Sequence, residues 1–172
     1  MTSSTQHALI SVYDKTSLSD LASFLSSKGV AIIATGNTYQ QLVDDKIAVT
    51  ELCDYTNFPE IMDGRVKSLH PKIYGGILAR PQQDQQTLNQ HDITRFNYVV
   101  CNLYPFIETI NQPDCSEPKA IEQIDIGGPS MIRAAAKNFH NVTVITNPDD
   151  YTDFIDELSS KGSISLDTRR LL

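Results

Sequence analysis

Short runs of apolar residues alternate along the chain with segments whose apolar residues recur at helical spacing. Residues 8–13 form the first apolar run and are bounded by polar residues, which predicts a short strand. In residues 18–25 leucine and alanine recur at helical spacing, and Thr16 or Ser17 is the expected cap of this helix. The unbroken apolar run 30–34 is typical of a strand buried on both faces of a parallel sheet.

The same alternation continues to the end of the chain. It predicts further strands at 48–50, 73–78, 98–103 and 142–145, and helices that carry Leu42 and Val43 or span 81–90, 118–123, 129–139, 149–161 and 166–172. No internal repeat and no linker divides this pattern. We therefore expect a single α/β domain over residues 1–172 with a largely parallel sheet.

Four polar loops fall where predicted strands end. They are 11–16, 35–38, 102–104 and a basic segment, 63–76. In open parallel sheets, ligands bind beyond the carboxyl ends of the strands. These loops are therefore expected to form one site at one edge of the sheet.

Composition and charge narrow the classes of partner. The formal net charge of −7 and the sequence pI near 4.9 argue against general binding to nucleic acid. No apolar run approaches the roughly 20 residues that span a bilayer, and the polar residues 1–6 are not expected to be a signal peptide. The three cysteines are widely spaced, which favours reduced thiols in the cytoplasm, and the histidines lack metal-ligand spacing.

The basic segment 63–76 concentrates cations in an acidic protein. It contains Arg65, Lys67, His70 and Lys72 without a regular apolar period, and Pro71 removes a backbone donor. Cations on irregular backbone predict a pocket for a small anion rather than a nucleic-acid surface. A solvated charged loop is the alternative.

Residues 35–38, Thr-Gly-Asn-Thr, join a predicted strand to a predicted helix. A helix N-terminus offers free N–H groups and partial positive charge, Gly36 allows close approach, and Thr35 and Thr38 carry hydroxyls. This is the outline of a phosphate site, to which Ser11 and Lys15 would add a hydroxyl and a cation. A simple capped helix start is the alternative for this stretch, and a solvated lysine for Lys15.

Residues 124–137 carry the candidate acid–base groups. Asp125 precedes Gly127 and Gly128 at the expected start of a helix, and Lys137 lies twelve positions further on. An acid and a lysine at one pocket can exchange a proton as general acid and base. A helix cap and a helix-end lysine are the alternatives. Tyr104 lies at another strand end and is placed to donate to an oxyanion, or is only a boundary aromatic.

Five stretches, in this order, resemble one family: ISVYDKTSL, ATGNT, DYTNFPEIMDGRVKSLHPKIYGGILAR, VVCNLYPF and IDIGGPSMIRAAAKN. They are similar to the N-terminal domain of the bifunctional purine-biosynthesis proteins that combine IMP cyclohydrolase with AICAR formyltransferase. The resemblance implies a methylglyoxal-synthase-like, three-layer α/β/α fold. A formyltransferase domain normally follows, and because the chain ends at Leu172 we expect a cyclohydrolase domain without it.

The resemblance also implies an activity. The family closes the ring of 5-formamidoimidazole-4-carboxamide ribotide, with loss of water, to give inosine monophosphate (IMP), without metal or cofactor. By resemblance, Lys67 polarises the formyl group, Asp125 and Lys137 transfer the proton, and Tyr104 lies nearby. The 5′-phosphate is assigned to Ser11, Lys15, Thr35, Gly36 and Thr38, and the ribose and carboxamide side to Arg65, His70, Asn102 and the Ile126–Gly127 backbone. A homodimer is expected.

Two positions depart from the family pattern. Many relatives have serine where Tyr13 stands and a second glycine where Asn37 stands, which removes one hydroxyl contact and narrows the phosphate turn. Three other interpretations stay open at this point. They are a methylglyoxal-synthase-type lyase, a regulatory module that binds a nucleotide without turnover, and an inactive fragment.

Overall fold

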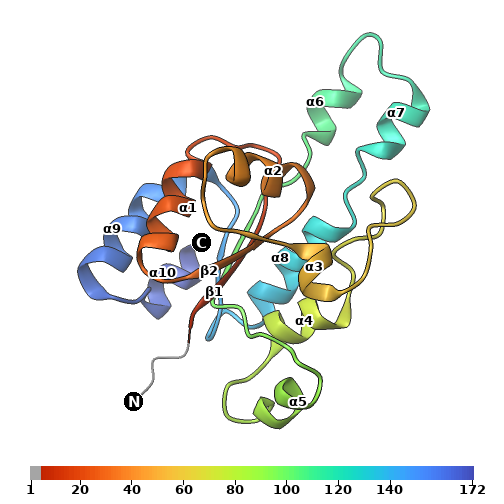
Figure 1. Ribbon diagram of the computed structural model, residues 1–172. Coiled ribbons are helices and arrows are strands. Elements are labelled where there is room, and N and C mark those ends of the chain that lie inside the picture. The colour runs from red at the N-terminus through yellow and green to blue at the C-terminus, as the bar shows by residue number, and fades with distance from the viewer. Residues whose placement is uncertain (1–4) are drawn as a thin grey trace.

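Five parallel strands form one sheet at the centre of the molecule, with helices on both faces (Figure 1). The computed structural model describes residues 5–172. The strands are β1 (His7–Ser11), β2 (Ala31–Ala34), β3 (Thr50–Glu51), β4 (Tyr98–Cys101) and β5 (Thr143–Ile145), in the order β3-β2-β1-β4-β5. The predicted three-layer α/β/α domain with a parallel sheet is thereby confirmed.

One face of the sheet packs against the helices α1 (Leu18–Ser27), α2 (Gly36–Asp44) and α9 (Tyr151–Lys161), with α10 (Leu166–Leu171) beside α9 (Figure 1). Ile10 and Val100 point into this layer from adjacent strands and are fully buried with Leu21. The rings of Tyr98 and Phe154 meet edge to face with centroids 5.4 Å apart. Val12, in the loop after β1, is buried in this layer.

The opposite face packs against α3 (Leu52–Thr56), α4 (Pro71–Leu78) and α8 (Gly127–Lys137). Leu9 and Val99 point into this layer, because successive side chains of a strand alternate between the faces. Ile73 and Met131 bring α4 and α8 against them. The two layers together bury the central strands, in agreement with their continuous apolar sequence.

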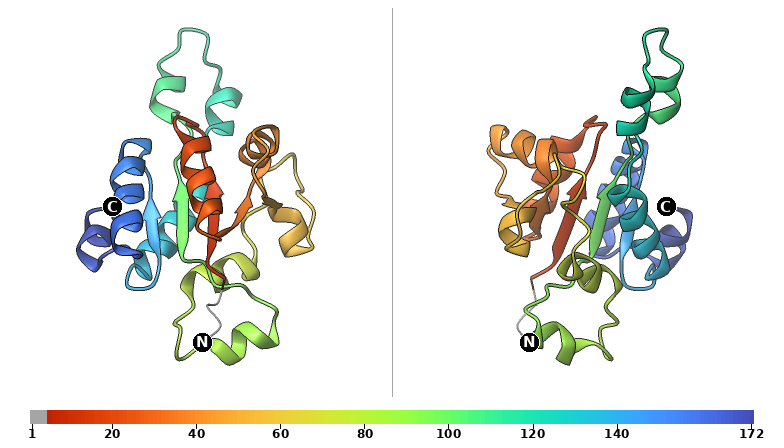
Figure 2. Two further views of the ribbon diagram at one scale, coloured as in Figure 1. Left: turned by 60° about the vertical axis from the view of Figure 1, so that its left-hand side comes forward. Right: turned by 90° about the vertical axis from the view of Figure 1, so that its right-hand side faces the viewer.

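A pair of short helices projects from the body beyond the end of β4 (Figure 2). These are α6 (Phe106–Ile110) and α7 (Glu117–Glu122), and we refer to residues 106–122 as the helical arm. The short helix α5 (Gln85–Gln90) lies at the other end of the molecule, and a 3₁₀ turn, η1 (Pro148–Asp150), leads into α9. Within residues 5–172 no helix is both long and apolar enough to cross a membrane.

The predicted strand at 73–78 is wrong, because this apolar run forms helix α4. Pro71 occupies the first turn, and Nδ1 of His70 accepts a hydrogen bond from the N–H of Lys72, which caps the helix. A Cβ at Gly76 would lie 2.8 Å from the Phe96 ring, so the glycine lets this helix approach the chain closely. Short apolar runs do not by themselves distinguish buried helices from buried strands. The basic segment is irregular only as far as His70.

Several boundaries also differ from the predictions. β4 ends at Cys101 rather than at 103, because its pairing with β1 stops at Ser11. β3 covers 50–51 instead of the predicted 48–50. α8 begins at Gly127, two residues before the predicted start. Ser17 stands at the start of α1 in a left-handed conformation and makes no side-chain cap, and α3 and α6 were not predicted.

Candidate active site

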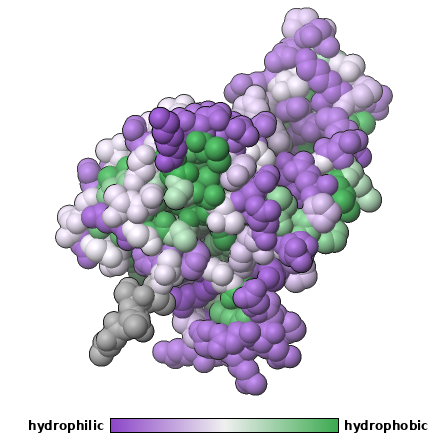
Figure 3. Space-filling view, in the orientation of Figure 1, coloured by the Kyte–Doolittle hydropathy of each residue, from purple (hydrophilic) through white to green (hydrophobic). Residues whose placement is uncertain are grey.

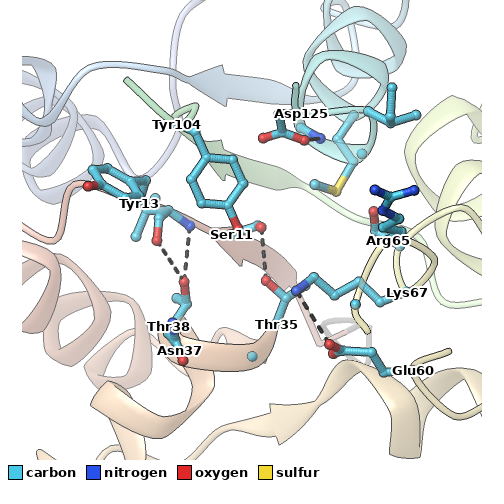
Figure 4. A pocket seen from close by; sticks show the side chains of 18 of the residues that line it. Ser11, Tyr13, Thr35, Asn37, Thr38, Glu60, Arg65, Lys67, Tyr104 and Asp125 are labelled. Atoms are coloured by element: carbon cyan, nitrogen blue, oxygen red, sulfur yellow. Dashed lines mark hydrogen bonds and ion pairs between the residues drawn. The ribbon is translucent and has the colours of Figure 1, made fainter. Parts of the chain in front are cut away.

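A cavity of about 570 Å³ opens at the carboxyl ends of β1, β2 and β4 (Figure 4). Its walls come from the loops after these three strands, the irregular basic segment, the end of the helical arm and the start of α8. The four polar loops predicted to meet at one sheet edge therefore do so. Twelve predicted site residues line the cavity: Ser11, Lys15, Thr35, Gly36, Thr38, Arg65, Lys67, Asn102, Tyr104, Asp125, Ile126 and Gly127.

The first turn of α2 forms one wall. Gly36 has φ of +43°, a left-handed conformation that favours glycine. A Cβ built on Gly36 would be 3.5 Å from Nζ of Lys67, so the ammonium group stands directly over this turn. Oγ of Ser11 and Oγ1 of Thr35 are 2.9 Å apart beside it. Hydroxyls, a cation and a helix N-terminus thus converge, which is an arrangement suited to a phosphate group.

Two predicted ligands use their polar atoms to shape the cavity. Oγ1 of Thr38 accepts from the N–H of Val12 and donates to its carbonyl, both at 3.0 Å. Oδ1 of Asn102 accepts from the N–H groups of Tyr13 and Asp14 at 2.7 and 2.9 Å, and Nδ2 donates to the carbonyl of Asp14 at 2.9 Å. These bonds hold the loop after β1 against α2 and against the end of β4.

The cations of the basic segment face acidic neighbours. Nζ of Lys67 lies 3.9 Å from Oε1 of Glu60, and the Lys67 side chain is 30% exposed. Arg65 forms an ion pair and hydrogen bonds with Glu122 at the end of α7, which connects the basic segment to the helical arm. Arg65 holds the pKa of the Glu122 carboxyl below its usual value, chiefly through the hydrogen bond.

Asp125 is placed by the start of α8. Its Oδ1 accepts from the N–H of Gly128 at 2.8 Å, so the carboxylate caps the helix and also lines the cavity. A Cβ on Gly128 would lie 2.6 Å from Oδ2 of Asp125, and a Cβ on Gly127 would collide with Oγ of Ser68. The two glycines therefore permit the close packing of Ser68 and of the Asp125 carboxylate against the start of α8.

Tyr104 follows β4 and turns its hydroxyl end into the cavity (Figure 4). Burial raises the pKa of its phenol, and the nearby Asp125, Glu60 and Tyr13 raise it further, because each disfavours the phenolate. The phenol is therefore protonated at neutral pH and available as a hydrogen-bond donor.

His70, which the resemblance assigns to the ribose and carboxamide side, does not line this cavity within one chain. Its Nδ1 caps α4 at 3.2 Å from the N–H of Lys72, and its ring lies 6.1 Å from that of Phe58. The helix formed by 71–78 accounts for this position, since the residue before a helix is a natural cap.

Lys137, which was expected to share a pocket with Asp125, does not line this cavity within one chain. It lies at the last turn of α8 and lines a second cavity, of about 420 Å³, with Arg80, Asn138 and other residues. Because α8 is continuous, Gly127 and Lys137 are separated by roughly 15 Å along the helix axis. Within one chain the two groups therefore do not meet.

The sequence-based reasoning missed several lining residues, among them Glu60, Ser68, Ile121, Glu122 and Ile124. Glu60 closely precedes the basic segment, so its charge was an available signal. Ile121, Glu122 and Ile124 became part of the wall only because the chain returns from the helical arm to the body, which no local pattern indicates. Within residues 5–172 no three His, Cys, Asp or Glu side chains gather as a metal site would require.

Comparisons with known proteins cover nearly the whole chain. The sequence model of the MGS-like domain matches residues 17–130, and that of the AICARFT/IMPCHase bienzyme matches residues 135–172. The crystal structure of ForH superposes with a TM-score of 0.87 at 34% sequence identity, over 97% of this chain and 87% of that one.

Proposed function

Because the chain belongs to the MGS-like domain family and is of the IMP cyclohydrolase type, we propose that it closes the ring of 5-formamidoimidazole-4-carboxamide ribotide to give IMP. The observation that carries this proposal is the meeting of Lys67, Tyr104 and Asp125 in one cavity with the phosphate-type turn of α2. The match of the last 38 residues (135–172) to a bienzyme of purine biosynthesis supports it.

The phosphate end of the substrate is assigned to the first turn of α2. Gly36 allows the phosphate to approach the helix N-terminus, and the hydroxyls of Ser11 and Thr35 are 2.9 Å apart beside it. Lys67 and Lys15 supply positive charge at the same cavity. Arg65 and the Ile126–Gly127 backbone are assigned to the ribose and carboxamide side. Thr38 and Asn102 fix the loop after β1 by hydrogen bonds to its backbone.

The reaction joins the carboxamide nitrogen to the formyl carbon. This nitrogen is a poor nucleophile and has to lose a proton as the C–N bond forms; Asp125 is the proposed acceptor. The formyl oxygen gains negative charge, which the Lys67 ammonium and the Tyr104 hydroxyl stabilise. The Asp125 carboxyl then returns the carboxamide proton to the formyl oxygen and the formamide N–H supplies a second one. The C–O bond breaks, the oxygen leaves as water, and the double bond forms between the former formyl carbon and the formamide nitrogen. Both reacting groups belong to one bound molecule, so their orientation removes much of the entropic barrier.

A nucleotide-binding module without turnover is the second candidate function. It is favoured by the position of Lys137, which lines the other cavity and leaves Asp125 without the lysine partner that the resemblance implies. Both candidates predict that IMP binds. Only the first predicts ring closure.

The test is a spectrophotometric assay of purine ring formation from the formylated ribotide. The wild-type protein is expected to turn over, and Lys67→Ala to lower kcat/KM by about 100-fold, the effect typical of losing one oxyanion stabiliser. Lys72→Ala is the matched control, because this lysine of the same segment contacts Asp92 and the Tyr55 ring instead of the cavity. IMP binding without ring closure would establish the second candidate, and equal rates for wild type and Lys67→Ala would remove Lys67 from the mechanism.

We also propose that the domain works as a homodimer, in the cytoplasm, fused to a formyltransferase domain. The fusion is supported by the bienzyme match at residues 135–172. Cytoplasmic location rests on the free cysteines Cys53, Cys101 and Cys115. Sedimentation of the purified protein at a mass of one chain would contradict the dimer.

A further inference from the structure

Two tyrosines from different loops meet at the mouth of the cavity. The rings of Tyr13 and Tyr104 are arranged edge to face, with centroids 5.4 Å apart and planes at 68° (Figure 4). Their side chains come from the loops after β1 and β4, which are neighbouring strands. This geometry is the favoured one for an attractive aromatic pair.

The backbone of Tyr13 is bonded directly to the loop after β4. The pairing of β1 with β4 ends at Ser11 and Cys101, just before both tyrosines. Oδ1 of Asn102, two residues before Tyr104, accepts a hydrogen bond from the N–H of Tyr13 at 2.7 Å. This bond connects the loop after β4 to the loop after β1. The position of Tyr13 is therefore set by a hydrogen-bonded connection between the two loops.

The ring of Tyr104 is free of hydrogen bonds among the described residues, as is that of Tyr13. It lies in the irregular segment between β4 and α6, its residue is 41% exposed, and within residues 5–172 its hydroxyl makes no hydrogen bond. A half-exposed ring without a hydrogen bond changes rotamer readily. The Tyr13 ring, which is 51% exposed, is its aromatic contact among the described residues, and the backbone of Tyr13 is anchored by Asn102.

We propose that Tyr13 is a positioning residue that holds the Tyr104 ring so that its hydroxyl points at the reacting formyl oxygen. This inference rests on the proposed ring closure. Tyr13 acts through Tyr104 and makes no contact with the reacting atoms.

The first test is a double-mutant cycle in the ring-closure assay. Tyr13→Ala is expected to lower kcat by about 10-fold, the upper range for loss of an aromatic pair, while KM stays within about threefold. Tyr13→Phe keeps the ring and is expected to recover most of the loss. In a Tyr104→Phe background, Tyr13→Ala is expected to lower kcat by less than twofold, because the hydroxyl that it positions is absent.

Independent effects in the cycle would overturn the proposal, since a Tyr13 that touched the substrate directly would lower kcat equally in both backgrounds. A tenfold loss in Tyr13→Phe would overturn it too, because the phenol oxygen and not the ring would then be responsible.

The second test does not depend on turnover. In protein with ring-¹³C-labelled tyrosine, the Tyr104 signals, assigned with Tyr104→Phe, are expected to shift in Tyr13→Ala and to stay near wild type in Tyr13→Phe. Unchanged Tyr104 signals in Tyr13→Ala would contradict the inference. Wild-type protein without ring closure would reject the proposed function instead, and these signals would still decide whether Tyr13 orders Tyr104.

Discussion

At the level of single residues, glycines determine how closely a ligand or a carboxylate can approach the backbone. Gly36 has φ of +43° at the first turn of α2, and an added methyl would meet Nζ of Lys67 at an ordinary 3.5 Å. The cost of a side chain at this position is therefore backbone strain and lost access rather than a clash.

Gly36→Ala is expected to lower the free energy of unfolding by ~1–2 kcal/mol and to raise the KM for the ribotide, because the methyl occupies the phosphate turn. Gly29→Ala is the matched control. Its φ is +75°, nothing lies within 4 Å of the added Cβ, and it is outside the cavity. It is expected to lose stability without a change in KM. An equal change in KM for both variants would contradict the phosphate assignment.

Gly128→Ala tests the placement of Asp125. The added Cβ would lie 2.5 Å from Cδ2 of Leu103 and 2.6 Å from Oδ2 of Asp125, so both side chains have to move, and kcat/KM is expected to fall about 10-fold or more. Gly75→Ala is the comparison, because its methyl meets the end of the Ile93 side chain at 3.0 Å away from this cavity. Full activity in Gly128→Ala would mean that the position of Asp125 has no bearing on turnover.

At the level of elements, buried polar side chains connect helices that the sheet alone does not align. Asn138 follows α8 and is 8% exposed, and its Nδ2 donates to the carbonyls of Ile77 and Ala79 at 2.7 and 3.0 Å. These are carbonyls at the end of α4, which the helix itself leaves unsatisfied. Asn138 thus ties the end of α4 to the end of α8.

Asn138→Ala is expected to destabilise the protein by ~1–3 kcal/mol, because two carbonyls lose their buried donor. For a domain of this size, this corresponds to a fall of about 5 °C in the Tm, measured by circular dichroism. Asn89→Ala on the exposed α5 should change the Tm by about 1 °C or less. Equal Tm values for the two variants would contradict the account of α4.

Glu157 connects α9 to the start of α10 by hydrogen bonds. Its carboxylate accepts from Nζ of Lys161 at 2.9 Å and from the N–H of Ser165 at 3.3 Å. Hydrogen bonds, that of Thr168 first and then that of Lys161, lower its pKa from 4.5 to about 2. A lowered native pKa means that the carboxylate contributes stability above pH 4.5 and loses the contribution as the pH falls toward 2.

The prediction concerns the difference in Tm between wild type and Glu157→Gln. Wild type is expected to have the higher Tm at pH 7, and the difference should narrow as the pH falls from 4.5 toward 2. Thermal melts at steps of half a pH unit measure this. A difference that is constant over the whole range would show that the charge of Glu157 is not what matters.

At the level of the whole molecule, the cavity is assembled from segments that lie far apart in the chain. Its lining extends from Ser11 to Met131 and crosses both layers that cover the sheet. On the face shown in Figure 3, the larger apolar patches lie on the body, and the helical arm is predominantly polar. A ligand in such a cavity stabilises the folded chain as a unit, because the unfolded chain has no site.

IMP at 100 times its dissociation constant is therefore expected to stabilise the fold by about 2.7 kcal/mol, or roughly 5–10 °C in Tm. Inosine, which lacks the phosphate, should give a much smaller shift in the same thermal melt. Lys67→Ala should reduce the IMP shift, and Lys72→Ala should preserve it. Equal shifts with IMP and inosine would argue against the phosphate turn at Gly36.

The sequence predicted the fold more completely than it predicted the site. The parallel α/β fold followed from the pattern, since runs such as 30–34 and 98–101 are apolar on both faces. The meeting of the strand-end loops followed from a general property of such sheets. The run 73–78 was assigned wrongly, because the helix depends on the His70 cap and on packing of Gly76 against Phe96.

By itself, the sequence determined which residues bring chemistry to the strand ends, because local hydrophobic period sets the strands and parallel pairing aligns their ends. Only the tertiary structure decided which of them face one another. It separated Lys137 from Asp125 through the unbroken length of α8, turned His70 into a cap, and returned the helical arm to bring Glu122 to Arg65. These outcomes depend on distance and direction in space, which arise from packing between segments and leave no mark in the local pattern.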